Sequence, residues 1–473
     1  MKNKIIPCQF LLFLMIFTIH AYFYGIVAWN QMSRYNSIYS FVETGYPQTH
    51  TFQIDRFITD PQNGMNTGDW SHNGEHFFSN KPPGTALLGI PIYWCLYQIE
   101  KILGKDSQLE PFAMINAYVI NCFVSVFWTA LSCVFLLSYL IKFSGLSLSS
   151  ALTLSLLYGL GTLVFPFDTS LWGHPTAAAF IMIQLYFFTL GGPRNLFKAG
   201  FIFALAGLMD YLAFFSLALS FIYLLVKKTP LKNIFYFLAG TSVPIAVLLG
   251  IHHFSFGNPF NTFCSFSGAM NELGRNHDPC KFGQFSWSHF CDLLITPYRG
   301  LLLYCPIFIL SLWQIGHLFI KRKFTLFHGL FLGNIIFYLV AVSTFIGWHG
   351  GSSTGPRYLI ITLPFWFLLL PPLSTLPGMS KFIWQGLAGI SVLQMLMITS
   401  VNTTVDVAIR SPMSVIYRQF WSGEFNLKMT GSIYNHWNWG QLFGLNGLWS
   451  LTPIFIVSGL FIMALCQLGK SNS

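Results

Sequence analysis

Long apolar stretches separated by shorter polar segments run through the whole chain. A helix needs roughly 20 predominantly apolar residues to cross a bilayer. Stretches of about that length lie at 8–29, 114–140, 148–165, 175–191, 233–251, 301–319, 326–346, 358–376, 383–400 and 448–468. The pattern therefore predicts an all-α, polytopic membrane protein.

Two further apolar stretches are less simple. Residues 199–226 have basic residues on both sides but are too short for two full spans, so we expect a short helical hairpin that turns near Asp210. Residues 84–103 follow Lys81-Pro-Pro-Gly, contain Pro91 and end with two charged residues. We expect this segment to form a juxtamembrane helix on the outer surface, where an amphipathic segment can bury one face.

The N-terminus begins with Met1-Lys-Asn-Lys and continues with an apolar run from Ile5 to Trp29. This run is longer than the apolar region of a signal peptide, which has about 7–15 residues, and no Ala-x-Ala-like cleavage site follows it. The sequence therefore predicts an uncleaved first transmembrane helix.

The basic residues indicate which segments face the cytoplasm, because Lys and Arg concentrate in cytoplasmic loops. Short segments without any acidic residue carry Lys2, Lys4, Lys142, Arg194, Lys198, Lys227, Lys228, Lys232, Lys321, Arg322, Lys323, Lys381 and Lys470. Placing these inside puts the long polar segments outside, at 30–113, 252–300, 347–357 and 401–447. We expect one membrane domain, 1–473, in which 30–113 is an extracytoplasmic acidic loop plus juxtamembrane helix, with no separate soluble domain.

The composition supports a membrane protein and excludes a nucleic-acid-binding one. Of the 473 residues, 54% are hydrophobic and only 8% are charged, whereas a soluble protein carries about 25% charged residues. The formal net charge is +10, but the basic residues are not gathered into a patch that could follow a phosphate backbone. We therefore expect the lipid bilayer as a partner and no nucleic acid.

The nine cysteines are scattered, with no CxxC pair and no Cys/His spacing typical of a metal site. Cys264, Cys280 and Cys291 share the segment 252–300, so a disulfide among them is an open prediction if this segment faces an oxidising compartment. His252 and His253 end a helix without a third ligand at zinc-like spacing, so no metal site is assigned to them.

Eight of the 15 acidic residues lie in the first outer segment, namely Glu43, Asp55, Asp60, Asp69, Glu75, Glu100, Asp106 and Glu110. In the simplest interpretation they only keep a loop soluble. The same loop, however, contains aromatic, His and Lys side chains that solubility does not require, and it ends in Lys81-Pro-Pro-Gly84. Because Pro fixes φ and restricts the preceding residue, this ending holds the chain rigidly where it returns to the bilayer. Such placement suits a site that meets a lipid headgroup.

Three stretches resemble a known family. The run His76-Phe-Phe-Ser-Asn-Lys-Pro-Pro-Gly-Thr, preceded by Asn66-Thr-Gly-Asp69, resembles the first outer loop of bacterial GT-C membrane glycosyltransferases, which are relatives of the protein O-mannosyltransferases and the lipid A aminoarabinose transferase. Similar to the same group are Thr296-Pro-Tyr-Arg-Gly-Leu-Leu-Leu-Tyr-Cys-Pro306 and Gly347-Trp-His-Gly-Gly-Ser-Ser-Thr-Gly-Pro-Arg-Tyr358. The order of one helix, an acidic loop, a juxtamembrane helix and a bundle also matches along most of the chain. The resemblance implies a GT-C-like bundle of about 11–13 transmembrane helices.

The resemblance also implies an enzyme, a hexosyl- or pentosyltransferase of the bacterial inner (plasma) membrane. It would move a sugar from a polyprenyl-phosphate carrier to an extracytoplasmic acceptor, which is a glycan, a lipid or a protein of the cell envelope. Its usual catalytic residue is a first-loop carboxylate, and many members carry an Asp-Glu pair directly after the first helix, where this chain reads Met32-Ser-Arg-Tyr. This departure moves the expected catalytic role to Asp55 and Asp69, then Glu75, and fourth Glu43. A positioned carboxylate can accept the proton of an attacking hydroxyl group.

The leaving lipid phosphate needs cations or hydrogen-bond donors, and the planar fork of Arg meets phosphate oxygens best. Lys81, Arg299 and Arg357 are all expected at outer helix ends, level with a phosphate headgroup. The alternative for each is an ordinary interfacial side chain that extends to water. The Gly-rich surroundings of Arg357 would let backbone approach a ligand closely. His76 and His349 complete the expected substrate-binding residues.

Other features leave alternatives open. Some members of the family bind a divalent cation through first-loop acids, and Asp55 with Asp69 would be the pair to do so here. Asp210 lies in an apolar stretch, where a charge at the bilayer centre costs about 3 kcal/mol, which favours a functional or paired role. Trp172-Gly-His174-Pro is most simply a polar turn after Asp168.

The alternative function is that of a lipid-linked-saccharide transporter or a non-catalytic relative that serves as a scaffold. Transporters place ionisable residues near the bilayer midplane. Apart from end residues, the candidate spans other than 199–226 contain no Asp, Glu, Lys or Arg. This argues against ion-coupled transport.

Overall fold

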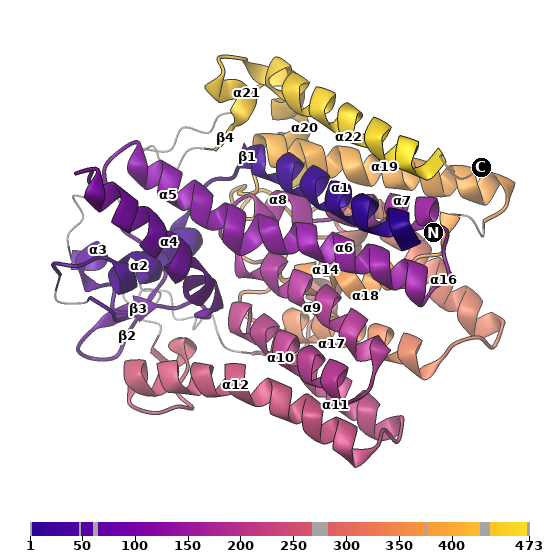
Figure 1. Ribbon diagram of the computed structural model, residues 1–473, viewed down its shortest axis with the longest axis horizontal. Coiled ribbons are helices and arrows are strands. Elements are labelled where there is room, and N and C mark those ends of the chain that lie inside the picture. The colour runs from indigo at the N-terminus through magenta and orange to yellow at the C-terminus, as the bar shows by residue number, and fades with distance from the viewer. Residues whose placement is uncertain are drawn as a thin grey trace.

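The computed structural model describes residues 2–46, 49–59, 65–266, 282–373, 376–425 and 436–470. Within these residues the chain is mostly helical, and its strands form two small antiparallel sheets, β1-β4 and β2-β3 (Figure 1).

The first part of the chain contains α1 (Lys2–Ala21), β1 (Phe23–Tyr24), α2 (Trp29–Val42), α3 (Asp55–Thr59), β2 (Trp70–His72), β3 (Phe77–Ser79), α4 (Gly84–Ile102), α5 (Phe112–Asn121), η2 (Cys122–Val126), α6 (Phe127–Lys142), α7 (Leu148–Leu160), α8 (Val164–Asp168), α9 (Gly173–Leu190), α10 (Pro193–Met209), α11 (Ala213–Val226) and α12 (Leu231–Phe256). The second part contains η3 (Phe263–Phe266), α14 (Trp287–Ile295), α15 (Leu301–Tyr304), η4 (Pro306–Phe308), α16 (Ile309–Ile320), α17 (Leu326–Thr344), η5 (Arg357–Thr362), α18 (Leu363–Leu368), α19 (Gly378–Val401), α20 (Pro412–Ser422), β4 (Trp437–Asn438), α21 (Trp439–Leu442), η8 (Gly447–Leu451) and α22 (Thr452–Lys470).

Five helices in the described part of the chain are long and apolar enough to cross a membrane. They are Phe112–Lys142, in which α5, η2 and α6 are continuous, and Leu231–Phe256, Leu326–Thr344, Gly378–Val401 and Gly447–Leu468. Shorter apolar helices accompany them, including Ile5–Ala21 and Ala213–Val226. This is the architecture expected of an all-α membrane protein.

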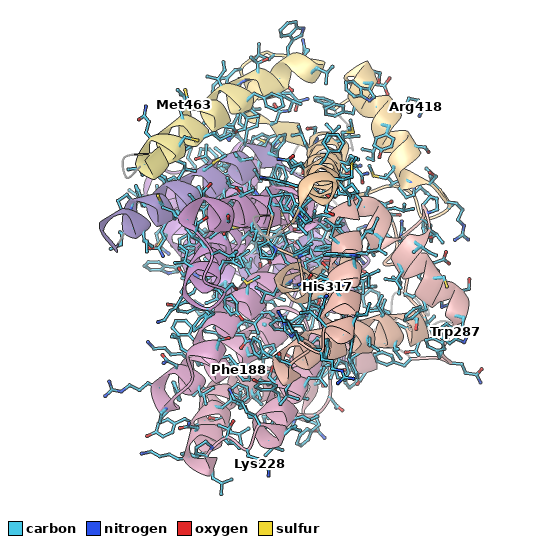
Figure 2. The ribbon with its side chains drawn as sticks, turned by 90° about the vertical axis from the view of Figure 1, so that its right-hand side faces the viewer. Phe188, Lys228, Trp287, His317, Arg418 and Met463 are labelled. Carbon is cyan, nitrogen blue, oxygen red and sulfur yellow. The ribbon has the colours of Figure 1, made fainter. Side chains whose placement is uncertain are left out.

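Large apolar side chains also cover much of the surface. Trp287 is 72% exposed and Met463 is 55% exposed, and both lie on the outside of the molecule in Figure 2. Along α12, Phe235, Val243 and Val247 are exposed as well. Extended apolar surface of this kind is unfavourable in water and marks contact with a membrane or another protein.

The first polar segment folds onto one end of the helical bundle. The elements α2, α3, β2, β3 and α4 gather at the left of Figure 1, whereas both chain ends lie at the right. The side chain of Asn73 donates a hydrogen bond of 2.9 Å to the backbone oxygen of Ser255, and that of Ser71 donates one of 2.6 Å to the backbone oxygen of Phe263. These bonds attach β2–β3 to the C-terminal end of α12 and to η3. We call the described residues between 29 and 102 the end cap.

Two glycines set the distance between α10 and α12. A Cβ atom on Gly200 would clash with the backbone oxygen of Phe237, and one on Gly240 would clash with the backbone oxygen of Phe197. The two backbones therefore approach more closely than larger residues would allow, as in membrane helix pairs that pack through small residues.

Several predicted helix ranges are wrong at their ends. The predicted first helix continues to residue 29, but α1 ends at Ala21 because the next residues form β1, which pairs with β4. Proline breaks other ranges, since it lacks the N–H that a helix needs. In 301–319 the chain bends at Pro306 before α16 begins, and in 358–376 α18 ends at Leu368, ahead of Pro371.

The helices of two less simple predictions are confirmed, whereas their placement relative to the membrane stays a prediction. Residues 199–226 form α10 and α11, and the chain turns at Asp210 as expected. The segment 84–103 forms one helix, α4, which continues through Pro91. Of the cysteines in 252–300, Cys291 is an exposed free thiol, whereas Cys280 and the side chain of Cys264 lie outside the described residues. The disulfide stays a prediction.

Candidate functional site

Charged side chains from distant parts of the chain meet where the end cap contacts the bundle. They are carried by α2, by the two ends of the β2–β3 hairpin, by the first turn of α9, by the end of α10 and by the start of η5. We call these six residues the charged cluster: Arg34, Asp69, Lys81, His174, Asp210 and Arg357. Ion pairs join Asp69 with Lys81 and His174 with Asp210, and the charges of Asp69, Asp210 and Arg357 act on the pKa of Arg34.

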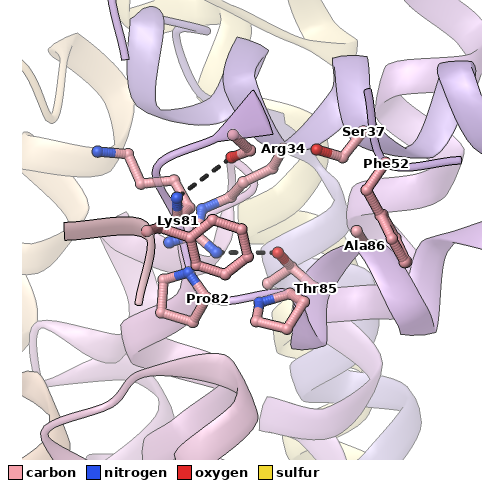
Figure 3. Close-up of a pocket in the computed structure, with 10 residues that line it drawn as sticks. Arg34, Ser37, Phe52, Lys81, Pro82, Thr85 and Ala86 are labelled. Carbon is pink, nitrogen blue, oxygen red and sulfur yellow. Dashed lines mark hydrogen bonds between the residues drawn. The ribbon is translucent and has the colours of Figure 1, made fainter. Parts of the chain in front are cut away.

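Arg34 is the most deeply buried cation of the cluster, with 4% of its surface exposed. Its Nε donates to Asn30 (3.3 Å) and its Nη1 donates to Thr85 (2.9 Å), the bond seen in Figure 3. No carboxylate lies within ion-pair distance of its guanidinium among the described residues. A Cβ on Gly173 would lie 3.2 Å from both terminal nitrogens, so the guanidinium packs directly on that glycine.

The β2–β3 hairpin brings Asp69 and Lys81 together. Asp69 directly precedes β2 and Lys81 follows β3, and the register pairs Trp70 with Ser79. The Nζ atom of Lys81 lies 2.9 Å from the Asp69 carboxylate. Ser33 Oγ donates to the backbone oxygen of Asp69 at 2.6 Å and lies 2.6 Å from Ser79 Oγ, which ties the hairpin to α2 beside Arg34.

The bundle contributes the other half of the cluster. His174 Nδ1 contacts the carboxylate of Asp210 in a buried pair. The guanidinium of Arg357 lies over the ring of Trp172, 4.5 Å from its centroid. Arg357 makes no ion pair with a described residue, and its Nε is buried without a hydrogen-bond partner. Its positive charge is therefore not neutralised by a directly paired carboxylate among those residues.

The pKa values of Arg34 and Lys81 in the end cap reflect burial and an excess of positive charge nearby. Burial lowers the pKa of Arg34 to about 10; Asp210 and Asp69 oppose this shift, and Arg357 adds to it. Burial also lowers the pKa of Lys81, which Asp69 opposes and which the charges of Arg34 and Arg357 strengthen. Both shifts mean that burial makes the protonated forms of Arg34 and Lys81 less favourable. An added anion would reduce this free-energy cost.

A small pocket opens beside these cations. It is lined by Arg34, Ser37, Phe52, Ser79, Lys81, Pro82, Pro83, Thr85, Ala86 and Phe263 (Figure 3). The prolines and Phe52 supply apolar walls, and the two cations and the hydroxyl groups supply donors. The pocket is narrow, with a volume of about 10 Å³, so it offers donors to the edge of an anion and does not enclose a whole phosphate group.

The structure places the predicted site residues in four different environments. Asp69, Lys81 and Arg357 belong to the charged cluster. Asp55 and His76 lie apart from it: the Asp55 carboxylate accepts from the backbone N–H of Phe77 (2.8 Å) and lies 3.2 Å from His76 Nδ1. This geometry fixes the start of α3 against β3. Glu75 is exposed at the tip of the hairpin.

Glu43 is buried and holds the end cap together. Its carboxylate accepts hydrogen bonds from Arg56 (2.9 Å), Tyr93 (2.6 Å) and Gln108 (2.5 Å). These partners come from α3, α4 and the segment that follows α4. All the contacts of this carboxylate are structural, which accounts for its position without a catalytic role.

Arg299 and His349 also lie outside the charged cluster. The buried guanidinium of Arg299 donates to the backbone oxygens of His349 (2.7 Å), Gly351 (2.9 Å) and Tyr298 (3.1 Å). This geometry favours support of the Gly-rich loop before Arg357 over direct contact with a substrate. The backbone N–H of Gly351 donates to His349 Nδ1 at 2.9 Å.

Sequence reasoning missed Arg34 and the role of His174. In the sequence, Arg34 belongs to the stretch after the first helix that lacks the Asp-Glu pair of the family. No local pattern distinguishes it from an arginine at the membrane interface. The sequence predicts a polar turn at Trp172-Gly-His174-Pro. In the structure this turn is buried, and His174 pairs with Asp210. Asp210 is the residue from which this pair could have been predicted, because an acid within an apolar stretch requires a partner.

The described residues contain no group of three His, Cys, Asp or Glu side chains that could hold a metal ion. No family model, curated protein or solved structure matches the chain.

Proposed function

We propose that this chain is a membrane glycosyltransferase that takes a sugar from a polyprenyl-phosphate carrier. The phosphate of the donor would bind between Arg34, Lys81 and Arg357, and the lipid chain would extend along the apolar surface of the bundle. The acceptor is an extracytoplasmic glycan, lipid or protein. The proposal includes a GT-C-like bundle of about 11–13 transmembrane helices in a bacterial inner membrane, with the end cap on the outer side.

The observation that carries this proposal is the burial of Arg34 without an anionic partner among the described residues. Burying an unpaired charge costs several kcal/mol, so proteins seldom retain one without a use. Arg34 lines a pocket together with Lys81, and Arg357 lies within electrostatic reach of both. An anion is the missing partner, and a phosphate offers oxygens to several donors at once.

Asp69 is the carboxylate best placed to act as the general base. It would accept the proton of the acceptor hydroxyl while the hydroxyl oxygen forms a bond to the anomeric carbon. The bond between that carbon and the phosphate oxygen breaks, and the lipid phosphate leaves with the electron pair, stabilised by the cations. Because Lys81 contacts Asp69 at 2.9 Å, a bound phosphate would compete for Lys81 and release the carboxylate for this role.

Transport of a lipid-linked saccharide is the second candidate, and one observation favours it. His20 and Asp168 form a fully buried pair within the bundle, with 2.6 Å between Nδ1 and the carboxylate. Ionisable pairs inside membrane domains often serve transport. The pair connects α1 with α8 and shares no contact with the charged cluster.

The test is sugar transfer by the full chain in membranes, with radiolabelled hexosyl and pentosyl polyprenyl phosphates as donors. We expect Asp69→Asn to lower the transfer rate about 10²–10⁴-fold while donor binding persists. Glu75→Gln is the matched control, because this carboxylate lies in the same hairpin but is exposed, and it should transfer at the wild-type rate. Full transfer by the Asp69→Asn variant would refute the mechanism, and movement of intact donor without transfer would favour transport.

A further inference from the structure

A second pocket lies on the opposite end of the loop that leads to Arg357. It is an open bowl of about 500 Å³ between α14, the Gly-rich loop and the segment after α19. We call it the aromatic bowl, and the residues that matter here are Ser288, Asp292, Tyr298, Trp348, His349 and Arg410. The volume falls in the range of small-molecule sites, about 300–1,000 Å³.

Aromatic rings form a rigid wall of the bowl. The rings of His289 and Trp348 stack with centroids 4.4 Å apart, and Tyr298 meets Trp348 edge to face. Tyr298 is fixed further by its hydroxyl, which donates to the backbone oxygen of Val407 at 2.8 Å. The wall is therefore preorganised and does not need to be built when a ligand binds.

The polar groups of the bowl include hydrogen-bond donors and acceptors that do not bond to one another. Asp292 and Arg410 both line the bowl, yet they form no ion pair, and neither does so with another described residue. The guanidinium of Arg410 lies over the ring of Tyr298, 4.7 Å from the centroid. Because Gly351 donates to His349 Nδ1, the proton of the neutral ring is on Nε2, which makes that nitrogen a donor. Burial and nearby arginines lower the pKa of His349, which favours this neutral form.

We propose that the aromatic bowl binds a saccharide through vicinal hydroxyl groups, and, resting on the proposed function, that this saccharide is the acceptor. A carboxylate can accept from two neighbouring hydroxyls, and a guanidinium can donate to two neighbouring oxygens. Apolar contact for pyranose C–H groups comes from the half-buried His289 ring and from exposed Val407 and Ala408, because Trp348 and Tyr298 are themselves buried. An anion such as phosphate is a poorer match, because Asp292 would repel it.

The aromatic bowl and the charged cluster are joined by the loop that leads to Arg357. Arg299 donates to His349 in the bowl lining and to Gly351 further along the loop, and Gly350 packs against Arg357. A saccharide that fixes His349 therefore also restricts the loop that positions Arg357. This connection places acceptor and donor on the two ends of one segment, 349–357.

Saccharide binding is measured on the full chain in nanodiscs, without donor, by saturation-transfer NMR. The probes are the methyl α-pyranosides of glucose, mannose, galactose and N-acetylglucosamine, with their 1,4-linked disaccharides. We expect binding of at least one disaccharide, weakened about tenfold or more by Asp292→Asn or Arg410→Gln, because each removes a charged hydrogen-bond partner. Arg418→Gln and Glu424→Gln are matched surface controls and should bind as the wild type does.

Ala408→Trp provides a variant whose folding is not at risk, because Ala408 is exposed and the indole would fill the bowl. It should abolish saccharide binding. Absence of binding for every probe, or equal binding to all variants, would overturn the inference. Binding without any sugar transfer would instead reject the proposed function and retain the saccharide site.

Discussion

Arg34 illustrates at the scale of a single residue how function can be separated from stability. Its guanidinium is buried and has two hydrogen bonds to neutral groups, whereas the equally buried Arg299 has three bonds to backbone oxygens. The first arginine leaves donor capacity unused, and the second has a satisfied structural role. Only the first is expected to be dispensable for folding.

Replacement of Arg34 by Met tests this difference. Replacing a buried charge that has no ion-pair partner by an apolar side chain of similar length removes its desolvation cost, which is several kcal/mol. We expect Arg34→Met to unfold at or above the wild-type temperature in detergent and to lose donor binding about 100-fold, since charge-assisted hydrogen bonds to phosphate are lost. The control, Arg299→Met, should unfold at a lower temperature, because buried backbone oxygens lose their donor. Equal destabilisation by both variants would contradict the assignment.

The pKa shifts predict how donor binding depends on pH. An anion binds the protonated forms of Arg34 and Lys81, which face Asp69 and Arg357. Because the pKa of Lys81 is lowered, its protonated fraction, and with it the affinity for the anion, falls as the pH rises toward 10. In the absence of ligand the folded chain loses the Lys81 proton at a lower pH than the unfolded chain does, so folding stability increases with pH between these two pKa values.

Binding of a polyprenyl phosphate, measured from pH 7 to pH 10, checks this prediction. Lys81→Arg should extend tight binding to higher pH, because arginine keeps its proton where lysine loses it. An affinity that does not change over this range in the wild type would show that Lys81 does not contact the phosphate.

At the scale of elements, the close packing of α10 against α12 depends on Gly200 and Gly240. The same helix α12 carries Gly250, where a Cβ would meet no atom within 4 Å. An added methyl group therefore clashes at Gly240 and is accommodated at Gly250, although the sequence alone does not distinguish these two glycines of α12.

Alanine at these two glycines provides a matched pair. Gly240→Ala should destabilise the protein by about 1–3 kcal/mol or more, because the added methyl group collides with backbone that cannot rotate away. Gly250→Ala should be neutral or stabilising by about 0.5–1 kcal/mol, since alanine favours a helix. Thermal unfolding in detergent measures both. If Gly240→Ala unfolds at the wild-type temperature, the close approach of the two helices is not present in solution.

At the scale of the whole molecule, the end cap and the chain termini lie at opposite ends. The basic turn that contains Lys228, between α11 and α12, lies far from the end cap because α12 runs from that turn to the β2–β3 hairpin. A protein built this way presents two chemically different faces. The proposed orientation assigns the end cap to the outer face.

Cysteine labelling tests the orientation. Cys95, Cys291 and Cys466, which are exposed among the described residues, are first replaced by Ser together with Cys264 and Cys280. In intact cells a membrane-impermeant maleimide should then label Glu75→Cys, whereas Lys228→Cys should react only after the membrane is opened. The reverse pattern would place the charged cluster on the cytoplasmic side and end the proposal of extracytoplasmic transfer.

The sequence by itself determined the helical class, the membrane-like composition, the hairpin at Asp210 and the helix α4. These follow from local periodicity and composition, because a run of apolar residues must form helix where backbone groups lack water. Three members of the charged cluster, Asp69, Lys81 and Arg357, were also identified from sequence. Lys81 and Arg357 stand beside rigid prolines or flexible glycines just before apolar stretches, whereas Asp69 was expected from the resemblance to the first outer loop of the glycosyltransferases.

Only the tertiary structure decided which charges meet. Asp55 and Asp69 lie in the same loop, yet one stabilises a turn and the other faces Lys81, because the β2–β3 register points them to different neighbours. Arg34 has no local signal at all. Arg34 is buried because α4, the turn before α9 and the hairpin pack around α2. Contacts between segments so distant in the chain produce no periodicity or motif spacing from which they could be predicted.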